Sequence, residues 1–293
     1  MNWRKNGLLL MLLSNLLFGF LPVTVKWSNE RGYAALQATF FRFSIAMVGV
    51  AVLAITGQQR LKVANARALF WRGFFGGLSV LLFFMTLQLT TAGKATLFNY
   101  TYTIWANVFA VVLGREKPPK GFGKLLVLAL LGLWLVLGVR LDRMVLGDAL
   151  GVLSGMASGA AVLAVKEARH TDNALSTFGS FTLFGWAFSL IALLVGARGE
   201  YREFSTWTPV DAPGFALLMA MGLVAMAAQL LFTQGYGYTS LAMGTLLSLL
   251  VPVLASLFGW ILLGEPLTPG FLSGTLLVLM ACYLLTRREA RAA

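Results

Sequence analysis

The sequence predicts an all-α integral membrane protein with ten transmembrane helices in a 5+5 inverted repeat. Three observations predict this class: an apolar composition, uncharged stretches of membrane-spanning length, and an internal repeat. Of the 293 residues, 58% are hydrophobic and 12% are charged, and the mean hydropathy is +0.80. Soluble proteins carry about 25% charged residues, and their surface needs polar side chains that this chain lacks. The composition therefore excludes a soluble enzyme, a disordered tail and a nucleic-acid-binding domain.

The predicted spans are uncharged runs long enough to cross a membrane. A hydrocarbon core of about 30 Å requires roughly 20 helical residues. The run 212–264 contains no charge and is too long for one helix, so the Gly- and Tyr-rich segment 235–238 is interpreted as a break. Continuous apolar runs such as 8–13 are incompatible with the alternation of a transmembrane β-barrel. We expect spans at 7–27, 33–56, 68–90, 93–114, 121–139, 147–166, 175–196, 213–235, 240–263 and 269–286.

The basic residues predict the orientation of the spans. With the N-terminus inside, 15 of the 23 Lys and Arg residues fall in inside segments and six in outside segments, while Arg42 and Lys94 lie in or near spans. This asymmetry predicts that both termini are cytoplasmic. The first span follows Arg4 and Lys5 but lacks a small-residue cleavage site, which favours an uncleaved anchor. We expect a multi-pass protein of a bacterial-type inner membrane.

The second half of the chain repeats the first. Two groups of positions recur, at offsets of 140 and 149 residues. Ser14, Gly19, Val25 and Lys26 recur as Ser154, Gly159, Val165 and Lys166, and Thr96, Leu97, Ala106, Phe109, Glu116, Gly121 and Phe122 recur as Thr245, Leu246, Ala255, Phe258, Glu265, Gly270 and Phe271. The predicted repeats are residues 1–143 and 144–293, with five spans each. Five is odd, so the second repeat must enter the membrane from the opposite side, an arrangement typical of transporters.

Some of these segments resemble a known family. The stretches 89–97 and 113–116 resemble the signature of the EamA-type transporters of the drug/metabolite transporter superfamily, and 238–242, 251–253 and 262–265 repeat it. The sequence Phe-Arg-Phe at 41–43 is also similar to that family. The resemblance implies ten helices, a 5+5 inverted repeat, and export or exchange of small metabolites. One departure is Thr103, which stands where the second repeat has Pro252.

Polar side chains at membrane depth are candidate ligands of a transported solute, because burying them in lipid is costly. In span 4, Asn99 and Tyr102 share a helical face, and Ser248 lies on the equivalent face of span 9. Amide, phenol and indole groups suit a neutral or zwitterionic solute with an apolar part. The same faces could equally be interhelical hydrogen-bonding surfaces. The predicted substrate-binding residues are Asn15, Phe18, Gln88, Asn99, Tyr102, Trp105, Ser158, Gln229, Thr233 and Ser248.

Four further residues are predicted to contribute charge or gating. Arg42 could bind a substrate carboxylate in a bidentate contact or serve only the structure. Lys94 begins span 4, and we expect its long side chain to extend toward the membrane surface. Pro22 and Pro252 interrupt spans 1 and 9 and are expected to bend them.

Several kinds of chemistry have no matching residues. All 11 acidic residues lie at span ends or in connectors, so a mid-membrane carboxylate proton relay is not expected. There is no phosphate-binding glycine loop, and the single Cys282 lies in an apolar run. No His, Cys and Glu cluster suggests a metal. We therefore expect neither an enzyme nor a cofactor, a metal or a nucleic-acid partner.

Together these features predict a secondary, non-ATP transporter that exports amino acids or amino-acid-derived metabolites by alternating access. One alternative is multidrug efflux or exchange of a phosphorylated or nucleotide-linked metabolite, with Arg42 and Lys94 neutralising the anion. An alternative of another class is a non-transporting membrane partner or a lipid scramblase. The expected partners are a small-molecule substrate and membrane lipids, and a monomer and a homodimer are both open.

Overall fold

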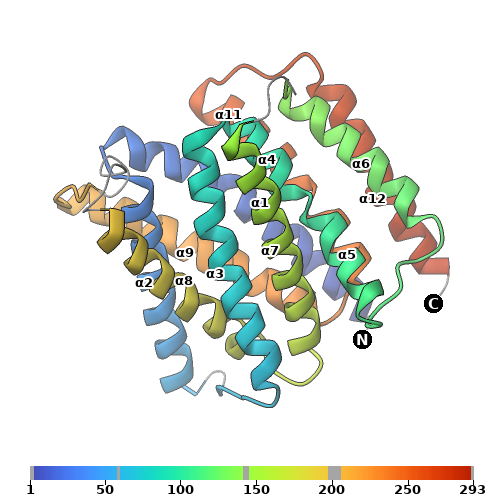
Figure 1. The fold of residues 1–293 in the computed structure, drawn as a ribbon, viewed down its shortest axis with the longest axis horizontal. Helices are drawn as coiled ribbons and strands as arrows, with labels where there is room; N and C mark the ends of the chain where they lie inside the picture. Colours follow the sequence, from blue (N-terminus) through green and yellow to red (C-terminus); the bar gives the residue numbers. More distant parts are fainter. Residues whose placement is uncertain (1–2, 58–59, 141–144, 197–205, 292–293) are drawn as a thin grey trace.

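The protein is an all-helical bundle (Figure 1). A computed structural model describes residues 3–57, 60–140, 145–196 and 206–291, and this part of the chain contains no strand. The boundary predicted at 143/144, together with Arg143, Arg198 and Arg202, falls outside the described residues. The helices are α1 (Trp3–Glu30), α2 (Ala35–Ile55), α3 (Ala66–Leu89), α4 (Ala92–Tyr100), α5 (Tyr102–Val112), α6 (Phe122–Leu137), α7 (Leu146–Ala168), α8 (Ala174–Gly196), α9 (Ala212–Gly235), α10 (Leu241–Leu247), α11 (Leu250–Leu263) and α12 (Phe271–Arg291).

These twelve helices make ten spans, because α4 and α5 form one span and α10 and α11 another. Eight apolar segments in the described residues are long enough to cross a membrane, among them the joined segment Leu241–Leu263. The shorter apolar helix α6 and the α4–α5 pair complete the ten. The prediction of a ten-span, all-α membrane protein is confirmed, although α1 and α12 extend several residues beyond the predicted ends.

The two broken spans are interrupted at equivalent positions. The break after α4 lies at Thr101, and the break after α10 lies at Ser248 and Leu249. In the second case Pro252 lacks an N–H, and its ring cannot fit against the carbonyl of Ser248. In the first case no proline is present, and the Thr101 and Thr103 hydroxyls instead donate to carbonyls of α4. Both repeats therefore contain the break, although only one contains the proline.

A single turn shows the direction of the spans. The turn at 236–239 follows α9; Gly7 of α1 packs against Tyr238 and Thr239, and Lys166 Nζ donates to the carbonyl of Thr239. The first turns of α1 and the last turn of α7 thus meet at one end of the bundle. These two helices, which begin the two repeats, consequently cross the bundle in opposite directions. We call this end, where α1 begins and α12 ends, the near end, and the opposite end the far end.

Two serines join the long helices in the same way in each half. Ser14 Oγ of α1 donates to the carbonyl of Ala228 in α9 (2.8 Å), and Ser154 Oγ of α7 donates to the carbonyl of Ser79 in α3 (3.0 Å). The two serines are 140 residues apart and the two carbonyls 149 apart, as in the sequence repeat. The crossing of α1 with α9 therefore corresponds to the crossing of α7 with α3.

Two glycines permit the closest approach of helices. A Cβ on Gly19 would lie 2.5 Å from Cβ of Leu254 in α11, and a Cβ on Gly159 would lie 2.7 Å from Cβ of Trp105 in α5. The glycines are again 140 residues apart and their neighbours 149 apart. Small residues at these points bring α1 and α7 against the helices that contain the breaks.

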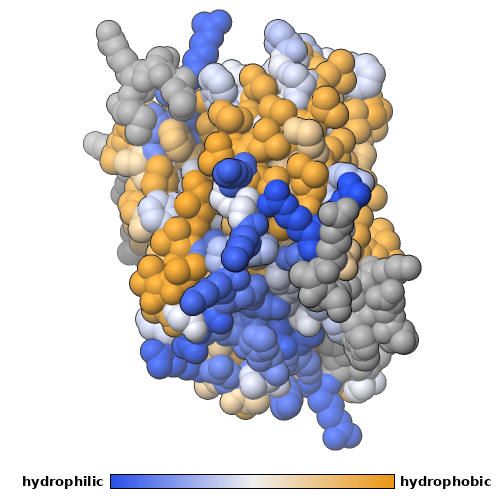
Figure 2. Space-filling view, turned by 90° about the vertical axis from the view of Figure 1, so that its right-hand side faces the viewer, coloured by the Kyte–Doolittle hydropathy of each residue, from blue (hydrophilic) through white to orange (hydrophobic). Residues whose placement is uncertain are grey.

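The main apolar core lies where the two halves meet. Its buried side chains include Ala106 and Leu133 of the first half and Leu246 and Val278 of the second. Around it, many large apolar side chains are exposed, as a lipid-facing surface requires. Figure 2 shows the right-hand face of Figure 1, with hydrophobic surface above and a hydrophilic region below. At the near end, Lys120 before α6, Lys124 in α6 and Arg287 in α12 are exposed basic residues.

At the far end, α9 begins at a polar cap. The Asp211 carboxylate accepts hydrogen bonds from the Gly214 amide (2.8 Å) and from the Tyr33 hydroxyl (3.0 Å). These donors lower the pKa of Asp211 below its usual value. The cap fixes the start of α9 against the connector between α1 and α2.

The glycine crossings predict a strong effect of one added methyl group. In Gly159→Ala the new Cβ meets the backbone nitrogen of Ala106 at 2.8 Å as well as Trp105, so neither neighbour can simply rotate away. We expect the free energy of unfolding to fall by about 1–3 kcal/mol. Gly123→Ala in α6 is the control, because nothing lies within 4 Å of its Cβ position. Thermal unfolding in detergent measures both, and equal stability of the two variants would contradict the proposed close crossing.

Candidate transport site

A polar cluster lies beside the break in span 4. Asn99 Nδ2 of α4 donates to Ser154 Oγ (2.7 Å) and Ser158 Oγ (3.3 Å) of α7. Ser158 Oγ also bonds to Ser79 Oγ of α3. The structure thus brings together the predicted residues Asn99 and Ser158 with two serines that carry the α3–α7 crossing. We call Ser79, Asn99, Ser154 and Ser158 the serine cluster.

A second polar group lies beside the break in span 9. Ser248 is buried and its hydroxyl donates to the carbonyl of Gly244 (2.9 Å), while the phenols of Tyr102 and Tyr236 lie close to it. Tyr102 and Ser248 were predicted from the sequence, whereas Tyr236 was not. The Gly-Tyr-Gly-Tyr sequence at 235–238 predicts a turn, but it does not indicate which of the two tyrosines is buried.

Asn15 supports the same break. Its side chain is fully buried, and Nδ2 donates to the carbonyl of Leu247 (2.8 Å), the last residue of α10. A carbonyl at a helix end inside the membrane needs such a partner. In this conformation Asn15 satisfies the broken span, and its Oδ1 atom is buried without a hydrogen-bond partner in the described part of the chain.

Asn107 was not among the predicted residues, although it links the halves. It is buried in α5, and Nδ2 donates to the carbonyl of Thr103 (2.8 Å) and to Thr245 Oγ1 of α10 (3.0 Å). Its spacing of four residues from Thr103 could have predicted that the two residues share a helical face. The partner in α10 could not be inferred from spacing.

The other predicted binding residues have varied surroundings. Phe18 packs edge-on against Phe232, Trp105 stacks on Phe109, and Gln229 and Thr233 are buried in α9. Gln88 belongs to α3, but its side chain falls outside the described residues. Pro252 is buried in the first turn of α11. Pro22 is exposed on α1, whereas Asn15 lies where α1 packs against α9 and α10 and is buried.

The two predicted charged residues, Arg42 and Lys94, differ in burial and in their partners. Arg42 is partly exposed in α2, with its guanidinium carbon 5.7 Å from the Phe43 ring, and it forms no ion pair with a described residue. Lys94 Nζ lies 3.5 Å from Asp148 Oδ2, and the two side chains are 9% and 0% exposed. The expectation that Lys94 extends to the membrane surface is wrong, because Asp148, at the start of α7, holds it inside the bundle.

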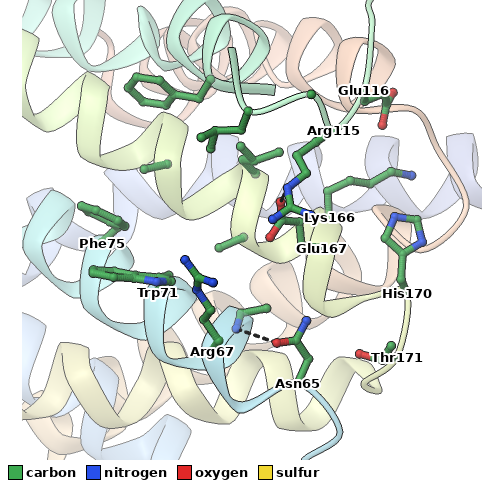
Figure 3. Close-up of a pocket in the computed structure, with 17 residues that line it drawn as sticks. Asn65, Arg67, Trp71, Phe75, Arg115, Glu116, Lys166, Glu167, His170 and Thr171 are labelled. Atoms are coloured by element: carbon green, nitrogen blue, oxygen red, sulfur yellow. Dashed lines mark hydrogen bonds and ion pairs between the residues drawn. The ribbon is translucent and has the colours of Figure 1, made fainter. Parts of the chain in front are cut away.

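A cavity of about 770 Å³ opens at the near end between α3, α5 and α7 (Figure 3). We call it the vestibule. It contains none of the predicted substrate-binding, charge or gating residues, because helix ends build it and their charges were interpreted as topology signals. It is lined by Asn65, Arg67, Ala68, Trp71, Phe75, Phe109, Leu113, Gly114, Arg115, Glu116, Ala160, Leu163, Ala164, Lys166, Glu167, His170 and Thr171.

The mouth of the vestibule is charged. Arg115 Nε pairs with Glu167 Oε1 at 2.8 Å, and Glu116 Oε1 accepts the Leu241 amide, which caps α10. Figure 3 shows the Arg67 side chain beside Trp71, on the wall formed by α3. The mouth therefore presents both signs of charge next to an indole ring, which suits a zwitterionic solute with an apolar part.

The deeper wall of the vestibule is apolar and leads toward the serine cluster. Phe75, Phe109 and Ala160 form this wall. One helical turn beyond Phe75 on the same helix is Ser79 of the serine cluster. Trp105, stacked on Phe109 at 6.0 Å, separates the apolar wall from the break in span 4.

The equivalent region at the far end is more closed. There Lys26 Nζ pairs with Glu265 Oε1 at 2.8 Å, and the rings of Phe20 and Phe258 meet at 5.8 Å. Phe20 is the repeat equivalent of Ala160. A cavity of about 340 Å³ remains, lined by Trp27, Glu30, Arg31, Pro213 and Leu217. Thus Ala160 lines the open crevice at the near end, and its equivalent Phe20 lies in the closed crevice at the far end.

Ten spans, two oppositely oriented halves and breaks within two of the spans are features of membrane transporters. The chain belongs to the EamA-like transporter family, which it matches over residues 5–138 and 145–287, five spans in each stretch. It is 23% identical over 288 residues to the pseudopaline exporter CntI of Pseudomonas aeruginosa, covering 97% of both chains. An uncharacterized transporter of Archaeoglobus fulgidus is 25% identical over 280 residues, covering 95% of both. A solved crystal structure shares the fold at a TM-score of 0.77 and 17% identity, covering 98% of this chain and 99% of the other.

The buried Lys94–Asp148 pair predicts that removing one charge destabilises the protein and that removing both restores most of the stability. Lys94→Met leaves the Asp148 carboxylate buried without its cation, although the Thr90 hydroxyl still donates to it. We expect the free energy of unfolding to fall by about 3–5 kcal/mol. Adding Asp148→Asn to Lys94→Met should restore most of it, because a neutral amide replaces the unpaired charge. Chemical denaturation in mixed micelles measures the series, and a double variant as unstable as the single one would show that the pair is not the cause.

Proposed function

We propose that this protein is a secondary transporter that exports small amphipathic metabolites, with amino acids or their derivatives first, by alternating access. The single observation that carries the proposal is the contrast between the two ends. The vestibule is open at the near end, while Lys26–Glu265 and Phe20–Phe258 occupy the equivalent place at the far end. Membership of a transporter family and the likeness to a pseudopaline exporter support it.

Because the two halves have equivalent helix contacts, the protein has two conformations with similar packing available to it. Each half contains the same serine and glycine crossings, so each can adopt the conformation that the other now has. Exchanging these conformations closes the near end and opens the far end, with the breaks in α4–α5 and α10–α11 at the centre. This is the alternating access expected of inverted repeats.

We place the near end in the cytoplasm of a bacterial-type cell. The inside segments hold 15 of the 23 basic residues, and the near-end vestibule includes Arg67, Arg115 and Lys166. In this orientation both termini are cytoplasmic and the vestibule receives solute from the cytoplasm, which fits export. Transport down the solute's own gradient is sufficient, since no described Asp or Glu lies at the middle of a span.

Reconstitution in liposomes tests the function directly. The purified protein is assayed for saturable uptake of labelled amino acids and derivatives, for chemical conversion of these solutes, and for flipping of fluorescent lipids. We expect saturable flux without conversion or flipping. Flipping without flux would support the scramblase alternative and contradict transport.

The vestibule predicts a specific block. Ala160→Phe gives α7 the aromatic side chain that Phe20 gives α1, and it would meet Phe109 as Phe20 meets Phe258. We expect flux to fall to near that of protein-free liposomes, while the melting temperature stays close to that of the wild type, because the added ring enters open space. Ala51→Phe, on an exposed face of α2, is the control and should keep its flux. Full flux in Ala160→Phe would show that solute does not pass through the vestibule.

A further inference from the structure

One side of the vestibule faces the membrane. Helix α7 lies between α3 and α5 and packs against both (Figure 1). The α7 face that lines the vestibule carries Ala160 and Ala164. Toward the far end the same face continues, at helical spacing, through Met156, Leu153 and Leu146. Leu153 and Leu146 are 48% and 70% exposed, so this face of α7 contacts lipid, and the vestibule is a recess in the lipid-facing surface.

Both edges of the recess are apolar. On the α3 edge, Trp71 is 40% exposed, and its ring stacks on Phe75 at 5.2 Å. Figure 3 shows these two rings side by side on the wall formed by α3. On the α5 edge, Phe109 lines the recess, and Leu113, four residues closer to the near end, is 61% exposed. An acyl chain lying along α7 would therefore contact rings and aliphatic side chains on both sides.

The mouth of the recess has one cation without a partner. Arg115 pairs with Glu167 at 2.8 Å, and Lys166 donates to backbone carbonyls. Arg67, in the first turn of α3, is exposed, and no described residue accepts a hydrogen bond from it. Its side chain lies beside Trp71 (Figure 3). A phosphate at the level of the lipid headgroups would thus meet a free guanidinium next to an aromatic wall.

The apolar part of the recess has the length of one lipid leaflet. Leu153 lies eleven residues from Ala164, a distance of about 16 Å along α7. Half of the hydrocarbon core is about 15 Å thick. Beyond Leu153 the same face continues with Ala149 and Leu146, which offer nothing polar to a headgroup moving toward the far end. The recess therefore suits a lipid that stays in the leaflet of the near end.

We propose that an anionic phospholipid of the near-end leaflet binds in this recess, with its phosphate on Arg67 and one acyl chain along α7 between Phe75 and Phe109. The guanidinium donates two parallel hydrogen bonds to the phosphate oxygens. A headgroup with net negative charge is preferred, because it neutralises Arg67 without adding a second cation. The bound lipid forms the fourth side of the vestibule. The proposal depends on the placement of the protein in a membrane and holds whichever solute is transported.

Lipids with the same acyl chains and different headgroups test the site. Delipidated protein in detergent is titrated with dimyristoyl phosphatidylglycerol or dimyristoyl phosphatidylcholine. The thermal shift is recorded, and native mass spectrometry counts the bound lipids. We expect phosphatidylglycerol to bind about tenfold more tightly, as expected for hydrogen bonds to a charged group, and Arg67→Gln to remove this preference.

Two further arms separate this site from unspecific charge effects. Arg287→Gln is the matched control, because it changes an exposed arginine of the near end that does not line the vestibule, and it should keep the preference. Since Arg67 is exposed, Arg67→Gln should leave the melting temperature of the lipid-free protein unchanged. Glycerol 3-phosphate carries the phosphate without acyl chains, and it should not stabilise the protein at concentrations at which the lipid saturates.

Fluorescence quenching locates the acyl chain. Brominated acyl chains quench nearby tryptophans, of which this chain has eight. We expect brominated phosphatidylglycerol to quench the wild type more than brominated phosphatidylcholine does. Trp71→Phe keeps an aromatic ring against Phe75 and should reduce this excess, whereas Arg67→Gln should abolish it.

Several results would overturn the lipid site. They are equal binding of the two lipids by the wild type, a preference that survives Arg67→Gln, and a preference lost to the same extent in Arg287→Gln. Stabilisation by glycerol 3-phosphate would assign the recess to soluble phosphate compounds, and flipping of fluorescent phosphatidylglycerol would contradict a lipid confined to one leaflet. Binding is measured without flux, so its failure leaves the proposed transport intact, and absence of flux for every solute leaves the lipid site intact.

Discussion

The structure depends on how backbone carbonyls are satisfied where two spans break inside the membrane. Lipid offers no hydrogen bonds, so each carbonyl freed at Thr101 or Ser248 requires a partner from the protein. Asn15 donates to Leu247 at one break, and threonine hydroxyls serve the other. To reach these breaks, α1 and α7 must approach closely, which Gly19 and Gly159 allow. The central position of α1 and α7, and hence the shape of both crevices, follows from that requirement.

The two ends of the bundle use equivalent residues differently. Lys26 pairs with Glu265 at the far end, whereas its repeat equivalent Lys166 donates to the carbonyls of the turn after α9 and Glu116 caps α10. The far-end pair is about half exposed, at 42% and 50%, so its contribution to stability is about 0–1 kcal/mol. Such a pair can break and re-form at little cost, which is what a moving end requires. The Lys94–Asp148 pair cannot break in this way, because either charge alone would be left buried.

The polar groups of the interior fall into two kinds. The serine cluster is satisfied by its own hydrogen bonds, so it holds α3, α4 and α7 together. Arg72, Tyr236 and Thr233 retain buried atoms that no described residue satisfies. Unsatisfied groups are expensive in a membrane protein and are therefore better candidates for solute contact than satisfied ones. By the same distinction, the Asn15 amide group has a structural role through Nδ2, which donates to Leu247, while its Oδ1 has no hydrogen-bond partner in the described residues.

The sequence by itself determined the membrane class, the ten spans and the correspondence between the halves. Hydrophobic runs and repeated residues can both be read directly along the chain, without knowing which helices touch. It also placed Asn99, Ser158, Tyr102 and Ser248 near the centre, since their depth follows from their place along a span. Only the tertiary structure decided which partners they have, where the vestibule opens, and that Lys94 is buried against Asp148. Lipid and protein interior are equally apolar, so hydrophobicity does not choose the neighbours of a span. Packing of small residues and polar pairing across helices make that choice, and both join residues far apart in the chain.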